Sequence, residues 1–114
     1  MNQQVKEKWL SALRSGDYKQ TQNYLHKEDG FCCLGVLCDL YGKEHNVEWN
    51  LAVAEDEDRT HYRFQNHPAS LPFPVIEWAG VGSHNPSIPG TSLVGLNDNG
   101  STFNEIADFI EEHL

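Results

Sequence analysis

All three cysteines of the chain lie in its most apolar run, FCCLGVLCDLYG at residues 31–42. Thiolates are common zinc ligands, and His26 or His45 could add a fourth ligand to Cys32, Cys33 and Cys38. Structural zinc sites, however, take ligands in pairs spaced two to four residues apart, whereas adjacent cysteines on a strand point to opposite sides. We therefore predict that the cysteines pack in the core as small apolar side chains, and that the protein holds no metal and no cofactor.

A cysteine nucleophile is the alternative role for this run. Cys33 lies where a predicted strand leads into a helix, and the sequence CLGVL at residues 33–37 faintly resembles the cysteine motif of the NlpC/P60 peptidases. A helix N-terminus lowers the pKa of a thiol, but the mechanism also requires a histidine base held by a third group. His61, His67 and His84 are available, although none lies in the strand context of that family. A small cysteine hydrolase is our third hypothesis.

The segment Arg14–Gln20, with the sequence RSGDYKQ, combines residue types that bind nucleotides. Arg14 suits forked contact with a phosphate, Tyr18 suits stacking on a base, and Gln20 suits hydrogen bonding to a base edge. The structural alternative is a helix C-terminus at which Arg14 complements the dipole, Gly16 caps the helix and Tyr18 enters the core. Both interpretations stay open on the sequence alone.

Two tryptophans and one polar pair complete the candidate site. An exposed Trp9 or Trp49 would offer a ring for stacking, and the pair Asn97-Asp98 would face a ligand or cap the turn before the last helix. The predicted ligand-binding residues are thus Arg14, Tyr18, Gln20, Trp9, Trp49, Asn97 and Asp98.

Amphipathic patterns predict an α+β domain, whose first half holds all of these residues except Asn97 and Asp98. Apolar residues at helical spacing predict a helix over residues 3–15, and the central run predicts a short strand at Phe31–Cys33 that leads into a buried helix ended by Gly42. Part of the polar segment Asp17–His26 should form a strand that pairs with Phe31–Cys33. Lys43–Asn46 should then be a loop.

The second half of the chain predicts a hairpin and two further helices. Strands at Val47–Ala54 and Thr60–Phe64 should flank an acidic turn, Glu55–Asp58, whose spacing does not match a calcium loop. Other expected elements are a short helix with its apolar residues at 75–79, ended by Gly80, a loop at 81–90, a strand at 91–96, and a last helix that begins with a capping box of Thr102 and Glu105. We expect both terminal helices and the central helix to pack on a small antiparallel sheet of about four strands.

Composition indicates one domain in a reducing compartment. The chain has 114 residues, of which 39% are hydrophobic, and this is large enough for one core but too small for two. No apolar run approaches the roughly 20 residues of a membrane span, and the N-terminus lacks an apolar signal core. An odd number of cysteines is a poor disulfide framework. We therefore predict a cytoplasmic protein without a membrane partner.

The negative charge of the chain is unevenly distributed. The net charge is −9, with +3 over residues 1–27, −2 over 28–43 and −10 over 44–114. Nucleic acid is held by clustered Lys and Arg, so this balance speaks against a nucleic-acid partner. The N-terminal third is the expected source of positive charge for a small anionic ligand.

Three parts of the chain resemble a family of small proteins common in tailed phages and prophages. They are W-x-x-A-L-R-S-G-x-Y-x-Q at Trp9–Gln20, C-C-L-G-V at Cys32–Val36, and L-N-D…F-x-x-I-A at Leu96–Ala107, whereas residues 43–90 match only loosely. The resemblance implies a phage context, and small phage proteins without enzyme motifs often counter host defence.

That context shapes two hypotheses besides the hydrolase. The first is a non-catalytic protein of the host cytoplasm that sequesters a nucleotide-derived immune signal, such as a cyclic oligonucleotide or a cyclic ADP-ribose, through the predicted residues. The second is an acidic inhibitor or DNA mimic that binds a host defence protein, as the −10 of residues 44–114 suggests. Many such binders form homo-oligomers, so an oligomer is also among our expectations.

Overall fold

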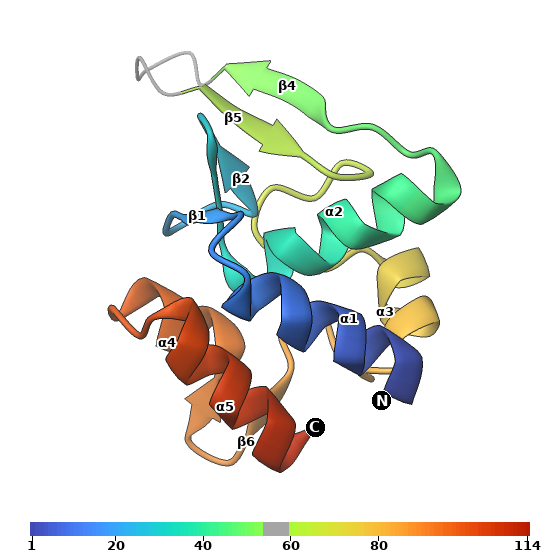
Figure 1. Cartoon of the computed structure of the whole chain (residues 1–114). Coiled ribbons are helices and arrows are strands. Elements are labelled where there is room, and N and C mark those ends of the chain that lie inside the picture. Colours follow the sequence, from blue (N-terminus) through green and yellow to red (C-terminus); the bar gives the residue numbers. More distant parts are fainter. Residues whose placement is uncertain (54–59) are drawn as a thin grey trace.

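The central helix α2, Cys33–His45, contacts the sheet and three other helices in the computed structural model, which describes residues 1–53 and 60–114. The sheet lies on one side of α2, and α1, α3 and α4 pack on its other sides (Figure 1). The fold is therefore a small α+β domain, as the sequence predicts. Its radius of gyration, 13.2 Å, is that of a compact chain of this length.

Helix α2 starts one residue earlier and ends later than the sequence predicts. The Sγ of Cys32 accepts a hydrogen bond from the Gly35 N–H at 3.4 Å, so Cys32 caps the helix and the preceding strand stops at Phe31. The prediction that Gly42 ends the helix is wrong, because the helix continues to His45 and ends at Asn46, whose φ is 59°. The predicted loop Lys43–Asn46 is thus mostly helix.

Two glycines let other segments approach α2 closely. A Cβ at Gly35 would lie 1.8 Å from the carbonyl oxygen of Leu25, and one at Gly42 would lie 2.5 Å from that of Val47. Both glycines therefore serve packing rather than helix termination.

Within residues 1–53 and 60–114, the main sheet has five strands in the order β1-β3-β2-β5-β4. Three of them are two residues long: β1 at Lys19–Gln20, β2 at His26–Lys27 and β3 at Gly30–Phe31. The predicted pairing within residues 17–33 is confirmed in that β2 is antiparallel to β3, but β1 pairs with β3 in parallel, so the sheet is mixed.

The predicted hairpin is confirmed with shorter strands. They are β4, Asn50–Val53, and β5, Thr60–Arg63, which pair antiparallel. The predicted acidic turn Glu55–Asp58 lies outside the described residues.

The predicted terminal helices are confirmed. Helix α1, Gln3–Arg14, buries Val5, Trp9 and Leu13, and α5, Phe103–His113, begins with the predicted capping box of Thr102 and Glu105. The two helices pack side by side although they lie at opposite ends of the chain (Figure 1). The short helix α3, Phe73–Ala79, ends at Gly80 as predicted, with φ 69°.

The strand predicted at residues 91–96 is wrong beyond its first two residues. Strand β7, Thr91–Ser92, pairs with β6, Ser87–Ile88, which lies inside the predicted loop. Helix α4, Leu93–Asp98, follows because the Ser92 hydroxyl accepts from the Gly95 N–H at 3.0 Å and caps a new helix. In the part of the chain that the structure describes, no helix has the length and apolarity to cross a membrane.

Candidate functional site

Trp9 belongs to the core rather than to a binding surface. Its side chain is fully buried, and its Nε1–H donates to the carbonyl oxygen of Cys33 at 3.0 Å. The expectation of an exposed Trp9 is therefore wrong. The cause lies in the helix pattern, because Trp9 shares the buried face of α1 with Val5 and Leu13.

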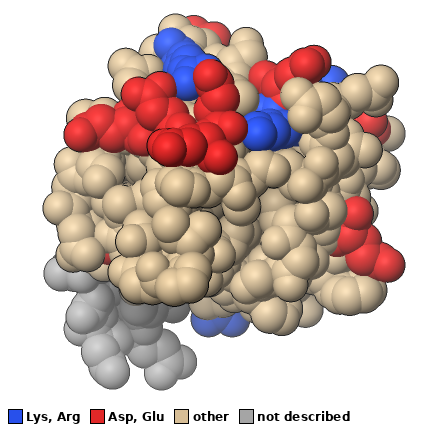
Figure 2. All heavy atoms as spheres, turned by 90° about the horizontal axis from the view of Figure 1, so that it is seen from below, with Lys and Arg blue, Asp and Glu red and all other residues tan. Residues whose placement is uncertain are grey.

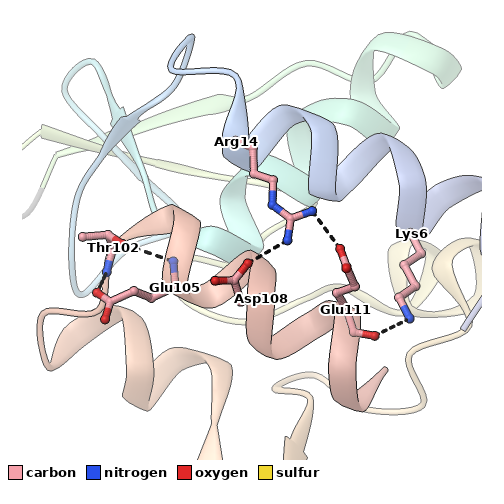
Figure 3. Close-up of polar contacts among 6 residues, drawn as sticks. All are labelled: Lys6, Arg14, Thr102, Glu105, Asp108 and Glu111. Carbon is pink, nitrogen blue, oxygen red and sulfur yellow. Dashed lines mark hydrogen bonds and ion pairs between the residues drawn. The ribbon is translucent and has the colours of Figure 1, made fainter.

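Arg14 is exposed, but its guanidinium binds two carboxylates of α5. Its two terminal nitrogens donate to Asp108 and Glu111, each at 2.8 Å. Lys6, which lies earlier on α1, donates to the backbone carbonyl oxygen of Glu111 (Figure 3). The hydrogen bonds that Arg14 donates to the carboxylates of Glu111 and Asp108 raise the pKa of its guanidinium. The predicted phosphate contact would thus have to compete with this double ion pair.

Gln20 and Asn97 meet, but they bind each other and the backbone. The Gln20 amide donates to Oδ1 of Asn97 at 3.0 Å and to the carbonyl oxygen of Ser101 at 2.8 Å. Asn97 is fully buried, so it does not face a ligand. Asp98 is exposed and accepts from the backbone N–H of Asn23 at 3.0 Å, so it binds the loop after β1 rather than the turn before the last helix.

The other two predicted residues, Tyr18 and Trp49, converge on Asp39. The Tyr18 hydroxyl donates to Oδ2 of Asp39 at 2.6 Å, and the Trp49 Nε1–H donates to Oδ1 at 3.1 Å. One turn later on α2, Lys43 places its Nζ 3.1 Å from the Asp39 carboxylate and 3.3 Å from the Tyr18 hydroxyl. We call these four residues the Asp39 cluster.

Burial and hydrogen bonding oppose each other at Asp39. Burial alone would raise the pKa of its carboxyl, but the hydrogen bonds from Tyr18, Trp49 and Lys43 outweigh it, and the pKa lies below its ordinary value. Burial and the bond to Asp39 raise the pKa of Tyr18. At neutral pH the cluster therefore contains a carboxylate, an ammonium and a neutral phenol.

Stacked rings support the cluster from the sheet. His26 lies between Phe31 and Tyr62, with ring centroids 3.9 Å and 4.2 Å away, and Trp49 packs against Phe64 at 4.9 Å. These contacts fix the Trp49 indole on one edge while its side chain stays half-buried. A rigid, partly open ring of this kind suits stacking on a planar ligand.

An open groove of about 360 Å³ lies beside the Trp49 indole. It is bordered by the end of α2 and the segment that leads to β4, and we call it the Trp49 groove; its polar residues are Asp39, Lys43, Asn46 and Glu48. The Lys43 side chain is 70% exposed there. A second groove, of about 500 Å³, runs between α1 and α2 on the Tyr18 side.

A smaller pocket of about 240 Å³ gathers Arg14, Tyr18 and Gln20 beside the start of α5. The predicted segment thus does border one cavity. However, its charged and amide groups already bind protein atoms, as described above.

The cysteines behave as the sequence predicts for core residues. All three are buried, and burial raises the pKa of the Cys32 thiol to about 11 and those of Cys33 and Cys38 well above their ordinary value. A thiol with a raised pKa is a poor nucleophile at neutral pH, so the burial of Cys33 disfavours hydrolysis through this residue. Among residues 1–53 and 60–114, no three His, Cys, Asp or Glu side chains gather in a way that could hold a metal ion.

Asp39 and Lys43 are the residues that sequence reasoning missed. One signal was present, since Asp39 is the single acid of the apolar run and Lys43 follows at the i+4 spacing of a helical ion pair. Their partners Tyr18 and Trp49 come from distant segments that only the fold brings together.

A family model described as a domain of unknown function (DUF8296) matches residues 1–114. No curated protein and no solved structure matches the chain.

Proposed function

Since this chain belongs to the DUF8296 family, we propose from its site that it is a non-catalytic binding protein that takes up a nucleotide-derived ligand in the Trp49 groove. The observation that carries the proposal is the half-buried Trp49 ring, held by the carboxylate of Asp39 at 3.1 Å beside an exposed lysine. A volume of about 360 Å³ is within the range of small-ligand sites.

Three side chains of the groove suit the parts of a nucleotide. The base stacks on Trp49, and the Glu48 carboxylate accepts from ribose hydroxyls. The Lys43 ammonium pairs with Asp39 on one side, but its side chain is 70% exposed and can bind a phosphate on the other. Among the residues that the structure describes, one lysine borders the groove, and Glu48 adds negative charge. A ligand with one charge per phosphate, such as a phosphodiester, is therefore favoured over a triphosphate.

The role in counter-defence rests on the resemblance to small phage proteins. In that role the protein would bind a cyclic oligonucleotide or cyclic ADP-ribose in the host cytoplasm and keep it from its receptor. A buried-cysteine core and a binding groove are compatible with sequestration, which requires affinity and no turnover.

The acidic-inhibitor alternative has less support from the charge arrangement. Several Asp and Glu side chains gather on the face shown in Figure 2, with Lys and Arg side chains directly beside them. Arg14 pairs with Asp108 and Glu111 on α5, so part of the negative charge of residues 44–114 is already neutralised. A DNA mimic needs its charges free for a basic partner.

Isothermal titration with cyclic dinucleotides, cyclic oligonucleotides, cyclic ADP-ribose isomers and nucleoside triphosphates tests the proposal. We expect heat with a phosphodiester ligand, about tenfold weaker binding for Lys43→Gln, and unchanged binding for the matched variant Arg14→Gln. Absence of heat with every ligand contradicts the proposed function. Loss of binding in Arg14→Gln but not in Lys43→Gln would instead place the ligand beside α5.

A further inference from the structure

Two open grooves meet at one hydrogen bond, which the Tyr18 hydroxyl donates to Asp39 at 2.6 Å. Asp39 borders the Trp49 groove, and Tyr18 borders the groove of about 500 Å³ between α1 and α2, which we call the Tyr18 groove. Trp49 donates to the same carboxylate at 3.1 Å, so the polar edges of the two rings lie one carboxylate apart. A single elongated ligand can therefore reach both grooves.

The Tyr18 groove has the same kinds of side chain as the Trp49 groove. Tyr18 and Leu40, both half-buried, give it an apolar wall. Its exposed polar residues include Glu7, Lys8, Ser11 and Asp17. The corresponding groups of the Trp49 groove are Trp49, Lys43 and Glu48. Each groove thus offers an aromatic ring, an ammonium and a carboxylate, and both volumes lie within the range of small-ligand sites.

Lys43 lies at the boundary between the grooves. Its Nζ is 3.3 Å from the Tyr18 hydroxyl and 5.5 Å from the centroid of the Tyr18 ring, while the same side chain borders the Trp49 groove. An ammonium has three N–H donors. Among the described residues, Asp39 and Tyr18 take two of them, which leaves the third for one oxygen of a ligand phosphate.

The charges of both grooves restrict how a ligand can lie. Glu7 and Asp17 border the Tyr18 groove and Glu48 borders the Trp49 groove, so a phosphate inside either groove would meet carboxylates. A neutral base with an exocyclic amino group can instead donate hydrogen bonds to those carboxylates. The favourable arrangement therefore places bases inside the grooves and phosphates beside the lysines.

We propose that the two grooves form one site for a cyclic dinucleotide whose bases carry amino groups, such as adenine or guanine. One base lies against Trp49, and the second lies against Tyr18 and Leu40. One phosphodiester contacts Lys43, and the other lies toward the exposed Lys8. This inference rests on the proposed function of the Trp49 groove, to which it adds a second base-binding site and a narrower class of ligand.

Isothermal titration with cyclic di-AMP and cyclic AMP tests the inference, because these ligands share a base and a phosphodiester but differ in the number of bases. We expect the wild type to take up one cyclic di-AMP per chain and to bind it about tenfold or more tightly than cyclic AMP. Stacking of one further base on an aromatic ring contributes about this factor or more. Cyclic di-UMP, whose bases lack amino groups, should bind less tightly than cyclic di-AMP.

Three variants separate the two grooves. Ser11→Trp places a large ring in the Tyr18 groove from an exposed position, so it should weaken cyclic di-AMP binding about tenfold and leave cyclic AMP binding in the Trp49 groove unchanged. Lys8→Gln should weaken cyclic di-AMP binding selectively as well. The matched variant Gln4→Trp, exposed on α1 outside both grooves, should bind both ligands like the wild type. Circular dichroism checks that all three variants fold.

Hydrogen exchange gives a second measure. Cyclic di-AMP should protect the amides of residues 15–18 and 46–49 in the wild type, but only those of residues 46–49 in Ser11→Trp. Equal affinities of the wild type for cyclic di-AMP and cyclic AMP, or a Ser11→Trp variant that keeps the tenfold preference, overturn the inference and leave the proposed function in place. So does a wild type that binds another nucleotide of the earlier titration but neither cyclic di-AMP nor cyclic di-GMP. Absence of binding with every nucleotide contradicts the proposed function and the inference together.

Discussion

The side-chain amide of Gln20 donates to Oδ1 of the buried Asn97 at 3.0 Å, and the same oxygen accepts from the backbone N–H of Cys33 at 3.2 Å. The Nδ2 of Asn97 donates to the carbonyl oxygen of Thr21 at 2.8 Å. One amide side chain thus connects α4, the segment after β1 and the first turn of α2. These contacts explain why the Gln20–Asn97 pair holds the fold together rather than a ligand.

We expect Asn97→Ala to lower the free energy of unfolding by about 3 kcal/mol, because it leaves several buried polar groups without partners. Urea unfolding followed by tryptophan fluorescence measures the change. The matched variant Asn99→Ala alters an exposed residue at the end of the same helix and should cost about 0.5 kcal/mol or less. Equal effects of the two variants would show that the Asn97 contacts contribute little.

Gly35→Ala should destabilise the protein, although alanine favours an isolated helix over glycine by about 1 kcal/mol. The added Cβ would lie 1.8 Å from the Leu25 carbonyl oxygen, and a shift of the backbone that relieves this clash costs free energy. Gly42→Ala, with 2.5 Å to the Val47 carbonyl oxygen, should cost less because that contact lies near the end of α2. Thermal unfolding of both variants shows which of them lowers the melting temperature more. A rise in the melting temperature of Gly35→Ala would contradict the observed packing.

The Asp39 cluster should make the free energy of unfolding depend on pH in the acidic range. Because the pKa of Asp39 in the folded protein lies below 3.8, its contribution is present above pH 3.8 and is lost as pH falls further toward the folded pKa. Asp39→Asn should therefore lower the free energy of unfolding by about 2 kcal/mol at neutral pH. The difference in this free energy between the variant and the wild type should become smaller as the pH falls below 3.8. Urea unfolding at several pH values measures this. Asp17→Asn, at an exposed carboxylate outside the cluster, is the control and should cost about 0.5 kcal/mol or less at neutral pH.

Much of the fold can be predicted because it depends on local patterns. The capping box of α5, the apolar face of α1 and the hairpin β4–β5 each follow from residues close in sequence. The errors at Gly42 and Leu93–Asp98 have different physical causes. Gly42 lies inside the helix, where it lets the Val47 carbonyl oxygen approach closely. At Leu93–Asp98 the Ser92 hydroxyl caps a helix in a sequence that would otherwise favour a strand.

The candidate site could be predicted only in part. The aromatic rings of Tyr18 and Trp49 make them predictable as stacking residues, but their common partner Asp39 lies 21 and 10 positions away in the chain. Arg14 and Gln20 have the chemistry of a nucleotide site, yet their side chains are bound by Glu111 and Asn97. Residue type indicates what a side chain can bind, whereas the fold decides which partner reaches it first.

The packing of α1 against α5 has a consequence for synthesis of the protein. Lys6 and Arg14 find their partners in Asp108 and Glu111, roughly a hundred residues later. A ribosome must therefore release residues 103–113 before α1 can be fully covered. Until then the buried face of α1, with Trp9 at its centre, is open to chaperones and proteases, so this domain should complete its fold only after residues 103–113 have left the ribosome.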